Sequence, residues 1–157
     1  MMRVDAYTHF LPTRFFKEVM SAGNHKDIGK RMMGVPSIYD VKVRLKVVDK
    51  FKDYAQVLSY PMPPFELMTK DAKQTEEYAK IVNDGFAELC AKHPDHFPGW
   101  VAQAPMAAPD CGVREAARAK RLPFPLWLFA ILPDSSKPAG QRPWSGVCLL
   151  EKNQRSA

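Results

Sequence analysis

The strongest constraint on the fold is an alternation of strand-like and helix-like segments that continues to about residue 119. Short β-prone runs occur at residues 2–7, 55–60 and 97–103, and helical patterns occur at 13–22, 40–51, 71–92 and from 109 onward. The 71–92 pattern is the clearest, with an apolar stripe at helical spacing formed by Tyr78, Val82, Phe86 and Leu89. Strands that alternate with helices predict a parallel sheet joined by right-handed crossovers, either open or closed into a barrel.

The pattern breaks down after about Ala119. Residues 122–133 are apolar but follow neither a helical nor an alternating period, and their prolines exclude a long helix. Residues 134–157 contain turn-forming residues without a convincing element. We therefore divide the chain into βα units at 1–119 and an irregular, divergent tail at 120–157. The tail is expected to be a reading-frame artefact, a divergent replacement of what would otherwise follow, or a disordered segment. In the last helix before this boundary, Val113, Ala116 and Ala117 are expected to face inward.

The positive charge lies mainly in the last third of the chain. Residues 1–110 contain 15 Lys and Arg against 14 Asp and Glu, whereas residues 111–157 contain 8 against 3. The basic residues of this last part are scattered and no nucleic-acid recognition motif accompanies them, so a solvated chain end is favoured over a nucleic-acid-binding arm. The expected partners therefore exclude nucleic acid.

Membrane insertion and export are not expected. No apolar run approaches the roughly 18 to 20 residues that a spanning helix needs. An acid, Asp5, lies where a signal peptide would begin its apolar core. The three cysteines, Cys90, Cys111 and Cys148, are an odd number without CxxC spacing, which is typical of reduced thiols in a cytoplasmic protein.

The first strand ends in a polar cluster, Asp5-Ala6-Tyr7-Thr8-His9-Phe10-Leu11-Pro12. Polar residues at the carboxyl end of a barrel strand are well placed for catalysis. The cluster resembles the opening of the metal-dependent amidohydrolase superfamily, in which a first strand ends in a His-x-His pair. It is most similar to the amidohydrolase-related branch that contains aminocarboxymuconate semialdehyde decarboxylase, where a proline commonly follows the pair.

Further segments extend this resemblance over roughly residues 2–119. They are residues 40–49 (DVKVRLKVVD), 57–61 (VLSYP), 83–89 (NDGFAEL), 93–99 (HPDHFPG) and 104–106 (APM). The resemblance implies a TIM (β/α)₈ barrel and a metal-dependent carboxy-lyase, or otherwise a hydrolase, that acts on a small carboxylic or cyclic substrate. It also implies a bound divalent ion, zinc or manganese, that polarises the substrate or activates a water.

Carried over residue by residue, the resemblance makes His9 one metal ligand and puts Tyr7 at the position of the other family histidine. A neutral phenol is a poor replacement for an imidazole ligand. The further ligands of the family, a histidine and an aspartate from later strands, would fall beyond the matched part. Ser59, Pro61 and Met106 follow strands two and three and are the candidates for the substrate side. No catalytic residue is assigned.

Length limits what this chain can do. A (β/α)₈ barrel typically needs about 250 residues, and the 157 residues here supply about three strands before the pattern fails. We expect an incomplete, weakly active or inactive member of this family. The alternative is a non-catalytic remnant that self-associates through unclosed strand edges, and a basic nucleic-acid binder is a remote third reading.

Three other candidates are read as structural. His93 and His96 lie between a helix and the next strand, away from the expected catalytic edge. Cys90 falls on the apolar side of the 71–92 helix and is most simply a packing residue.

Overall fold

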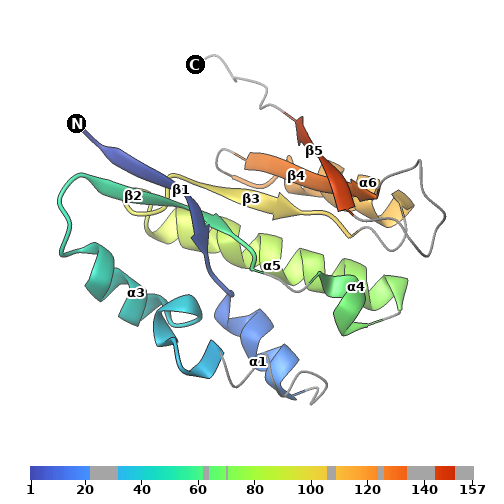
Figure 1. The fold of residues 1–157 in the computed structure, drawn as a ribbon, viewed down its shortest axis with the longest axis horizontal. Coiled ribbons are helices and arrows are strands. Elements are labelled where there is room, and N and C mark those ends of the chain that lie inside the picture. The colour runs from blue at the N-terminus through green and yellow to red at the C-terminus, as the bar shows by residue number, and fades with distance from the viewer. Residues whose placement is uncertain are drawn as a thin grey trace.

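The computed structural model describes residues 1–21, 32–61, 64–69, 71–105, 109–123, 126–133 and 144–150. In these ranges the strands are β1 (Arg3–His9), β2 (Tyr54–Ser59), β3 (Gly99–Gln103), β4 (Leu126–Pro133) and β5 (Trp144–Leu150). The helices are α1 (Thr13–Ser21), α3 (Val41–Val48), α4 (Phe65–Met68), α5 (Ala72–Lys92) and α6 (Pro109–Ala119), with a short 3-10 helix η1 (Pro36–Ile38). Figure 1 shows their arrangement.

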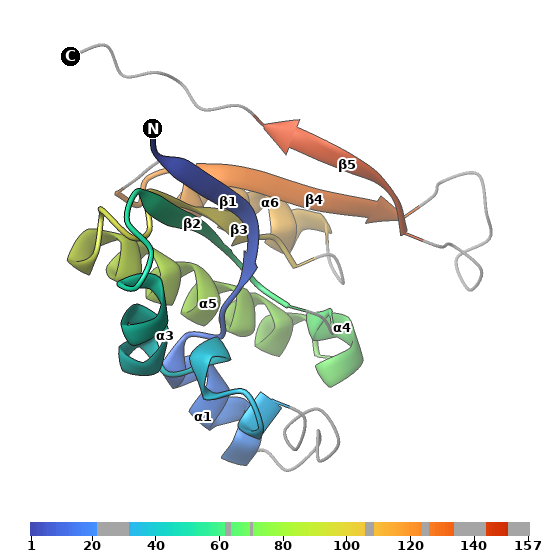
Figure 2. The ribbon, with the colours of Figure 1, turned by 60° about the vertical axis from the view of Figure 1, so that its left-hand side comes forward.

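The strands form a sheet in the order β1-β2-β3-β4-β5. The first four strands are parallel, and β5 pairs antiparallel with β4. Figure 2 shows that α1, α3 and α5 lie on the same side of this sheet. Parallel strands joined through helices are the architecture that the sequence predicts for the first part of the chain.

Helix α5 packs on the sheet through its predicted apolar stripe. Tyr78, Val82 and Phe86 are buried, and Leu89 packs at the margin of the same core. The ring of Phe86 lies 6.2 Å from that of Trp100 on β3, centroid to centroid. Although α5 has 21 residues, no helix within the described ranges is long and apolar enough to cross a membrane.

Two aspartates cap helices at the first residues of the predicted helical patterns, 40–51 and 71–92. The side chain of Asp71 accepts a hydrogen bond from the backbone N–H of Lys73 at the start of α5. Asp40 likewise accepts from the backbone N–H groups of Lys42 and Val43 at the start of α3. Each cap satisfies donors that have no partner inside the helix.

Helix α5 comes very close to the loop after β1 at Gly85. A Cβ atom added to Gly85 would lie 2.5 Å from Cβ of Pro12. No side chain fits at that distance, so glycine is required for this approach. The contact fixes α5 against the chain immediately beyond His9.

The segments after residue 119 differ from the expectation of a tail without regular elements. Leu126–Pro133 and Trp144–Leu150 form β4 and β5. An unbroken apolar run is compatible with a strand of a parallel sheet, because such strands need not alternate between apolar and polar residues. Pro123 and Pro125 precede the β4 strand and Pro133 ends it, so no proline interrupts its interior.

The inward face of α6 also differs from the prediction. Val113 and Ala117 are exposed and Ala116 is only partly buried. The buried positions are Cys111, Gly112, Glu115 and Ala119. The prediction followed the apolar residues, but the helix turns a carboxylate inward because that carboxylate has polar partners there.

Candidate functional site

The carboxyl ends of β1 and β2 bring two predicted site residues together. His9 and Ser59 are register partners, and each is the last residue of its strand. Nδ1 of His9 lies 2.9 Å from Oγ of Ser59. The register shifts between Asp5 and Thr8, so β1 contains one extra residue there. Such irregularities re-aim side chains next to functional sites.

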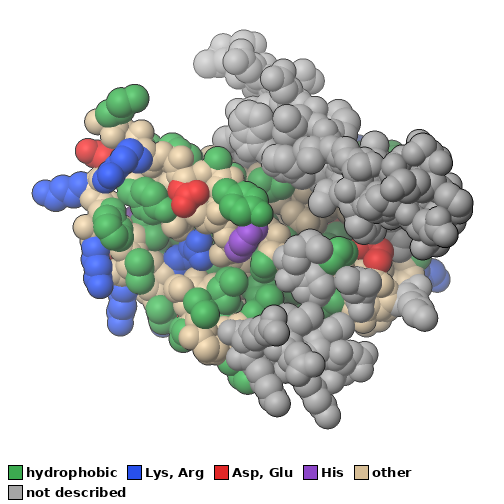
Figure 3. Space-filling view, viewed as in Figure 1, with side chains coloured by type: hydrophobic (Ala, Val, Ile, Leu, Met, Phe, Trp, Pro, Cys, Tyr) green, Lys and Arg blue, Asp and Glu red, His purple; other side chains and the backbone are tan. Residues whose placement is uncertain are grey.

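Tyr7 lies beside His9, as its place in the motif requires. The two ring centroids are 4.8 Å apart in an edge-on arrangement. Tyr7 is 80% exposed, whereas His9 is half-buried. In Figure 3 a histidine reaches the surface close to apolar and acidic side chains, on the face along which β1 runs.

The two remaining candidates for the substrate side are Pro61 and Met106. Pro61 is buried just after β2. Its neighbour Tyr60 packs against the rings of Phe15 and Phe65, and burial raises the pKa of the Tyr60 phenol, which therefore stays neutral. Met106 lies outside the described residues.

The two histidines read as structural lie in the connection that leads from α5 into β3. His93 is the residue at the C-terminal end of α5, and its backbone N–H donates to the carbonyl of Leu89. Nε2 of His96 lies 2.8 Å from Oδ1 of Asp49. A segment that precedes a parallel strand lies at the amino edge of the sheet, so both histidines are at the edge opposite His9.

A buried arginine supports the end of β1. Nη1 of Arg44, on α3, donates to the backbone carbonyl of His9 at 2.8 Å and to that of Ser37 at 3.0 Å. Its Nε donates to Oε1 of Gln56 at 2.9 Å. Burial lowers the pKa of Arg44, while Tyr54 and Asp5 oppose that shift. Arg44 is not among the site residues that the sequence predicts.

Hydrogen bonds continue from Gln56 back to the start of the motif. Nε2 of Gln56 donates to the hydroxyl of Tyr54, and this hydroxyl donates to Oδ2 of Asp5, both at 3.0 Å. Oδ1 of Asp5 accepts the backbone N–H of Tyr7. The polar groups of β1, β2 and α3 are therefore joined in one chain of hydrogen bonds that ends at the His9 carbonyl.

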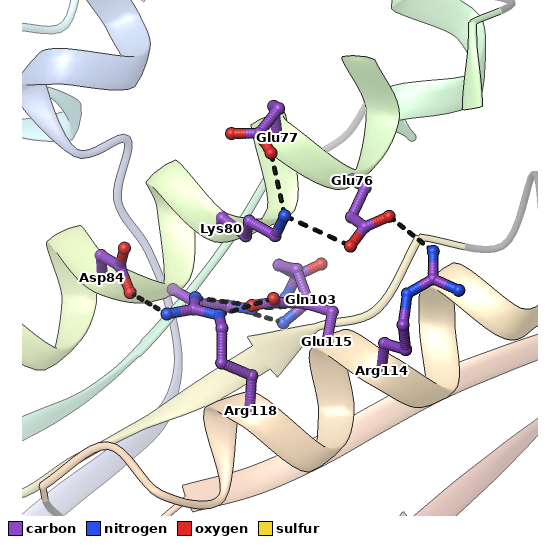
Figure 4. A network of polar contacts seen from close by, with 9 residues as sticks. Glu76, Glu77, Lys80, Asp84, Gln103, Arg114, Glu115 and Arg118 are labelled. Carbon is purple, nitrogen blue, oxygen red and sulfur yellow. Dashed lines mark hydrogen bonds and ion pairs between the residues drawn. The ribbon is translucent and has the colours of Figure 1, made fainter. Parts of the chain in front are cut away.

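A second polar network fixes the carboxyl end of β3 (Figure 4). Asn83 of α5 accepts the backbone N–H of Gln103 at 2.8 Å and donates to its carbonyl at 2.9 Å. The same amide nitrogen donates to Oε1 of Glu115 at 2.7 Å. Arg118 donates to both carboxylate oxygens of Glu115 and to Asp84. Helices α5 and α6 are thereby tied to the last residue of β3.

Glu76 forms a neighbouring set of ion pairs between α5 and α6. Its Oε2 lies 2.9 Å from Nη2 of Arg114, and its Oε1 lies 3.2 Å from Nζ of Lys80. The hydrogen bond from Arg114, with further contributions from Cys111 and Lys80, lowers the pKa of Glu76 to about 2. The carboxylate is therefore more acidic in the folded chain than in the unfolded one.

This lowered pKa predicts a pH dependence of stability. A folded pKa of about 2 against an ordinary value of 4.5 means that the Glu76 contribution is fully present above about pH 4.5 and is lost as the pH falls toward 2. We expect the difference in urea midpoint between wild type and Glu76→Gln to shrink over that range. Glu77→Gln, at an exposed neighbouring carboxylate, is the control. A difference that stays constant from pH 7 to 2 would contradict the assignment.

The described residues do not by themselves make a divalent metal site. Within the described ranges, no three His, Cys, Asp or Glu side chains lie together as ligands. Nδ1 of His9 is engaged with Ser59, and the Asp5 carboxylate is occupied by Tyr54 and Tyr7. His9 therefore offers one imidazole nitrogen, and its neighbour Tyr7 offers a neutral phenol, whereas a tightly held ion needs three or four protein ligands.

The parallel strands of the sheet, with polar residues at the carboxyl ends of β1 and β2, have the arrangement found in part of an α/β barrel. Comparison with known sequences finds relatives among decarboxylases. The chain is 34% identical over 76 residues to a gamma-resorcylate decarboxylase from Rhodococcus jostii (strain RHA1), a match that covers 48% of this chain. The matched part of the chain is thus related to decarboxylases of the amidohydrolase superfamily, as the motifs predict. The chain spans about a fifth of that relative, 22% of its length.

Solved structures agree with the partial-barrel prediction. A 2,6-dihydroxybenzoate decarboxylase from Rhizobium superimposes with a TM-score of 0.59 at 26% identity, over 80% of this chain and 37% of that enzyme. A dihydroxybenzoic acid decarboxylase from Polaromonas sp. JS666, solved with bound manganese and the inhibitor 2-nitroresorcinol, gives 0.55 at 23% identity over the same shares. The predicted fold class, a partial α/β barrel at the N-terminus, is confirmed. No family model matches the chain.

Proposed function

We propose that this chain carries the N-terminal βα units of a metal-dependent carboxy-lyase for dihydroxybenzoate-type aromatic acids. The sequence match to gamma-resorcylate decarboxylase is the observation that carries this proposal. The position of His9 at the carboxyl end of β1, with Ser59 beside it, supports it. In such an enzyme a divalent ion polarises the substrate, and His9 would be one of its ligands.

The ligand set within the described residues is incomplete, which leads us to propose that the chain alone is only weakly active. Purified protein is incubated with 2,6-dihydroxybenzoate and either Mn²⁺ or Zn²⁺. The CO₂ released and the metal that remains bound to the protein are measured for wild type, for His9→Ala and for a surface control, Lys46→Ala. We expect slow turnover that disappears in His9→Ala and persists in Lys46→Ala. Close to one tightly bound ion per chain would contradict the incomplete-site part of the proposal. The absence of any His9-dependent release would contradict carboxy-lyase activity.

A second candidate function is self-association without catalysis, and the state of β1 favours it. β1 is an edge strand of the sheet. Val4 and Tyr7 on it are 52% and 80% exposed. Exposed apolar edge strands pair with other chains, and a lysine on such a strand blocks pairing. We expect the apparent mass in size-exclusion chromatography with light scattering to fall in Val4→Lys, and an unchanged mass would contradict this candidate.

The boundary at residues 119/120 remains a proposal about the origin of the tail. Sequencing the DNA across the codons for Arg114 to Pro125 tests it, because a frame-shifted tail requires the family pattern to continue in another reading frame.

The cytoplasmic location also remains a prediction. Cys90 and Cys111, which are free and buried, are compatible with it. The expected lack of nucleic-acid partners is tested by the salt dependence of any binding.

A further inference from the structure

The hydroxyl of Ser59 has two polar neighbours and only one hydrogen to donate. Its Oγ lies 2.8 Å from the backbone carbonyl oxygen of Thr8 and 2.9 Å from Nδ1 of His9. A carbonyl oxygen can only accept, whereas an imidazole nitrogen can donate or accept according to the tautomer. If the hydroxyl hydrogen pointed at His9, two oxygen lone pairs would face each other at 2.8 Å.

The hydrogen of Ser59 therefore points at the Thr8 carbonyl, and Oγ accepts a hydrogen bond from Nδ1–H of His9. We propose that Ser59 is a positioning residue that holds His9 in the Nδ1–H tautomer and leaves the lone pair on Nε2. An imidazole whose other nitrogen is fixed in this way presents a defined ligating or proton-accepting atom. The inference deepens the proposed function, because Nε2 is then the atom that would meet an ion or substrate.

The surrounding fold holds both partners in place. The side chain of Thr8 is buried, and its Oγ1 donates to the carbonyl of Val57 at 2.7 Å, which ties β1 to β2 one residue before His9. Arg44 donates to the carbonyl of His9 itself. The backbone N–H of Phe10 donates to the carbonyl of Ser59 at 2.9 Å. With the backbone fixed on each side of both residues, the Ser59 hydroxyl and the His9 ring meet in a defined geometry.

The tautomer can be measured directly by long-range ¹H–¹⁵N NMR on histidine-labelled protein at about pH 8.5, where an ordinary imidazole is neutral. His9→Gln assigns the His9 signals. We expect the Nδ1–H form to predominate for His9 in wild type. His96 provides an internal contrast, because its Nε2 lies 2.8 Å from a carboxylate oxygen of Asp49. A carboxylate accepts only, so His96 is expected in the Nε2–H form.

Variants at Ser59 separate positioning from a merely structural role. Ser59→Ala is expected to shift His9 toward the Nε2–H form that predominates for free histidine in water, whereas Ser59→Thr, which keeps the hydroxyl, is expected to retain Nδ1–H. The His96 signals and the amide spectrum serve as the test that each variant is folded. A wild-type His9 in the Nε2–H form, or a tautomer that does not respond to Ser59→Ala in a folded variant, would overturn the proposal.

This experiment needs neither metal nor substrate. A chain that releases no CO₂ but shows the expected tautomer would contradict the carboxy-lyase proposal and leave the role of Ser59 intact. The converse result, His9-dependent turnover with the wrong tautomer, would remove the role of Ser59 alone.

Discussion

Replacing Glu115 with alanine is expected to lower the free energy of unfolding by about 2–4 kcal/mol. The side chain of Glu115 is fully buried, and it accepts hydrogen bonds from Asn83 and from two nitrogens of Arg118. Removing it leaves the buried amide of Asn83 without one acceptor and the guanidinium without its main partner. We place the loss below the value for a fully buried pair because Arg118 is 34% exposed and also contacts Asp84.

Matched variants isolate the role of the carboxylate. Glu115→Gln keeps an acceptor for Asn83 but removes the charge. Its free energy of unfolding should therefore lie between those of wild type and Glu115→Ala. Arg114→Ala breaks a more exposed ion pair on the same helix and should cost much less than Glu115→Ala. Urea unfolding of all three variants makes the comparison. A Glu115→Ala loss no larger than that of Arg114→Ala would show that the buried network contributes little.

Replacing Arg44 with methionine is expected to cost about 2–4 kcal/mol as well, because each buried acceptor left unpaired costs about 1–3 kcal/mol. The variant leaves the carbonyls of His9 and Ser37 and the amide oxygen of Gln56 without their donor. Methionine retains most of the side-chain volume, so the loss reports the hydrogen bonds more than the packing. The guanidinium also lies over the ring of Phe10, and that contact is lost too.

Two controls accompany this variant. Lys46→Met changes an exposed lysine on the same helix and should alter stability by about 0.5 kcal/mol or less. Arg44→Lys keeps the charge, but an ammonium cannot reproduce the fork of donors that reaches η1, β1 and β2 together. We therefore expect Arg44→Lys to recover only part of the loss. Full recovery would mean that charge alone, without the geometry of the guanidinium, supports the end of β1.

Regular elements with strong periodicity were predictable from the sequence. The stripe on α5 and the starts of α3 and α5, which follow Asp40 and Asp71, lie where the pattern places them. So does the meeting of His9 and Ser59, since adjacent parallel strands end at the same edge of a sheet. These features depend on local spacing and local hydrogen bonds, which a sequence displays directly.

The buried polar residues were missed because polarity was taken as a mark of the solvent face. Arg44 nevertheless falls on the apolar stripe of its helix, three residues after Val41 and four before Val48. Asn83 similarly lies three residues before Phe86, and Glu115 four before Ala119. A polar residue in phase with a stripe was the available signal. Several of the partners of these residues lie 12 to 35 positions away, which spacing alone cannot reveal.

The antiparallel direction of β5 decides which end of this strand lies at the edge of the sheet that carries His9. In a βα unit the helix returns the chain to the amino edge, so that every strand points the same way and every strand end contributes to one rim. Here β4 is followed by β5 running backward beside it. Leu150, the last residue of β5, therefore lies at the edge opposite His9 and Ser59. Of these two strands, β4 therefore ends, and β5 begins, at the edge that carries His9 and Ser59.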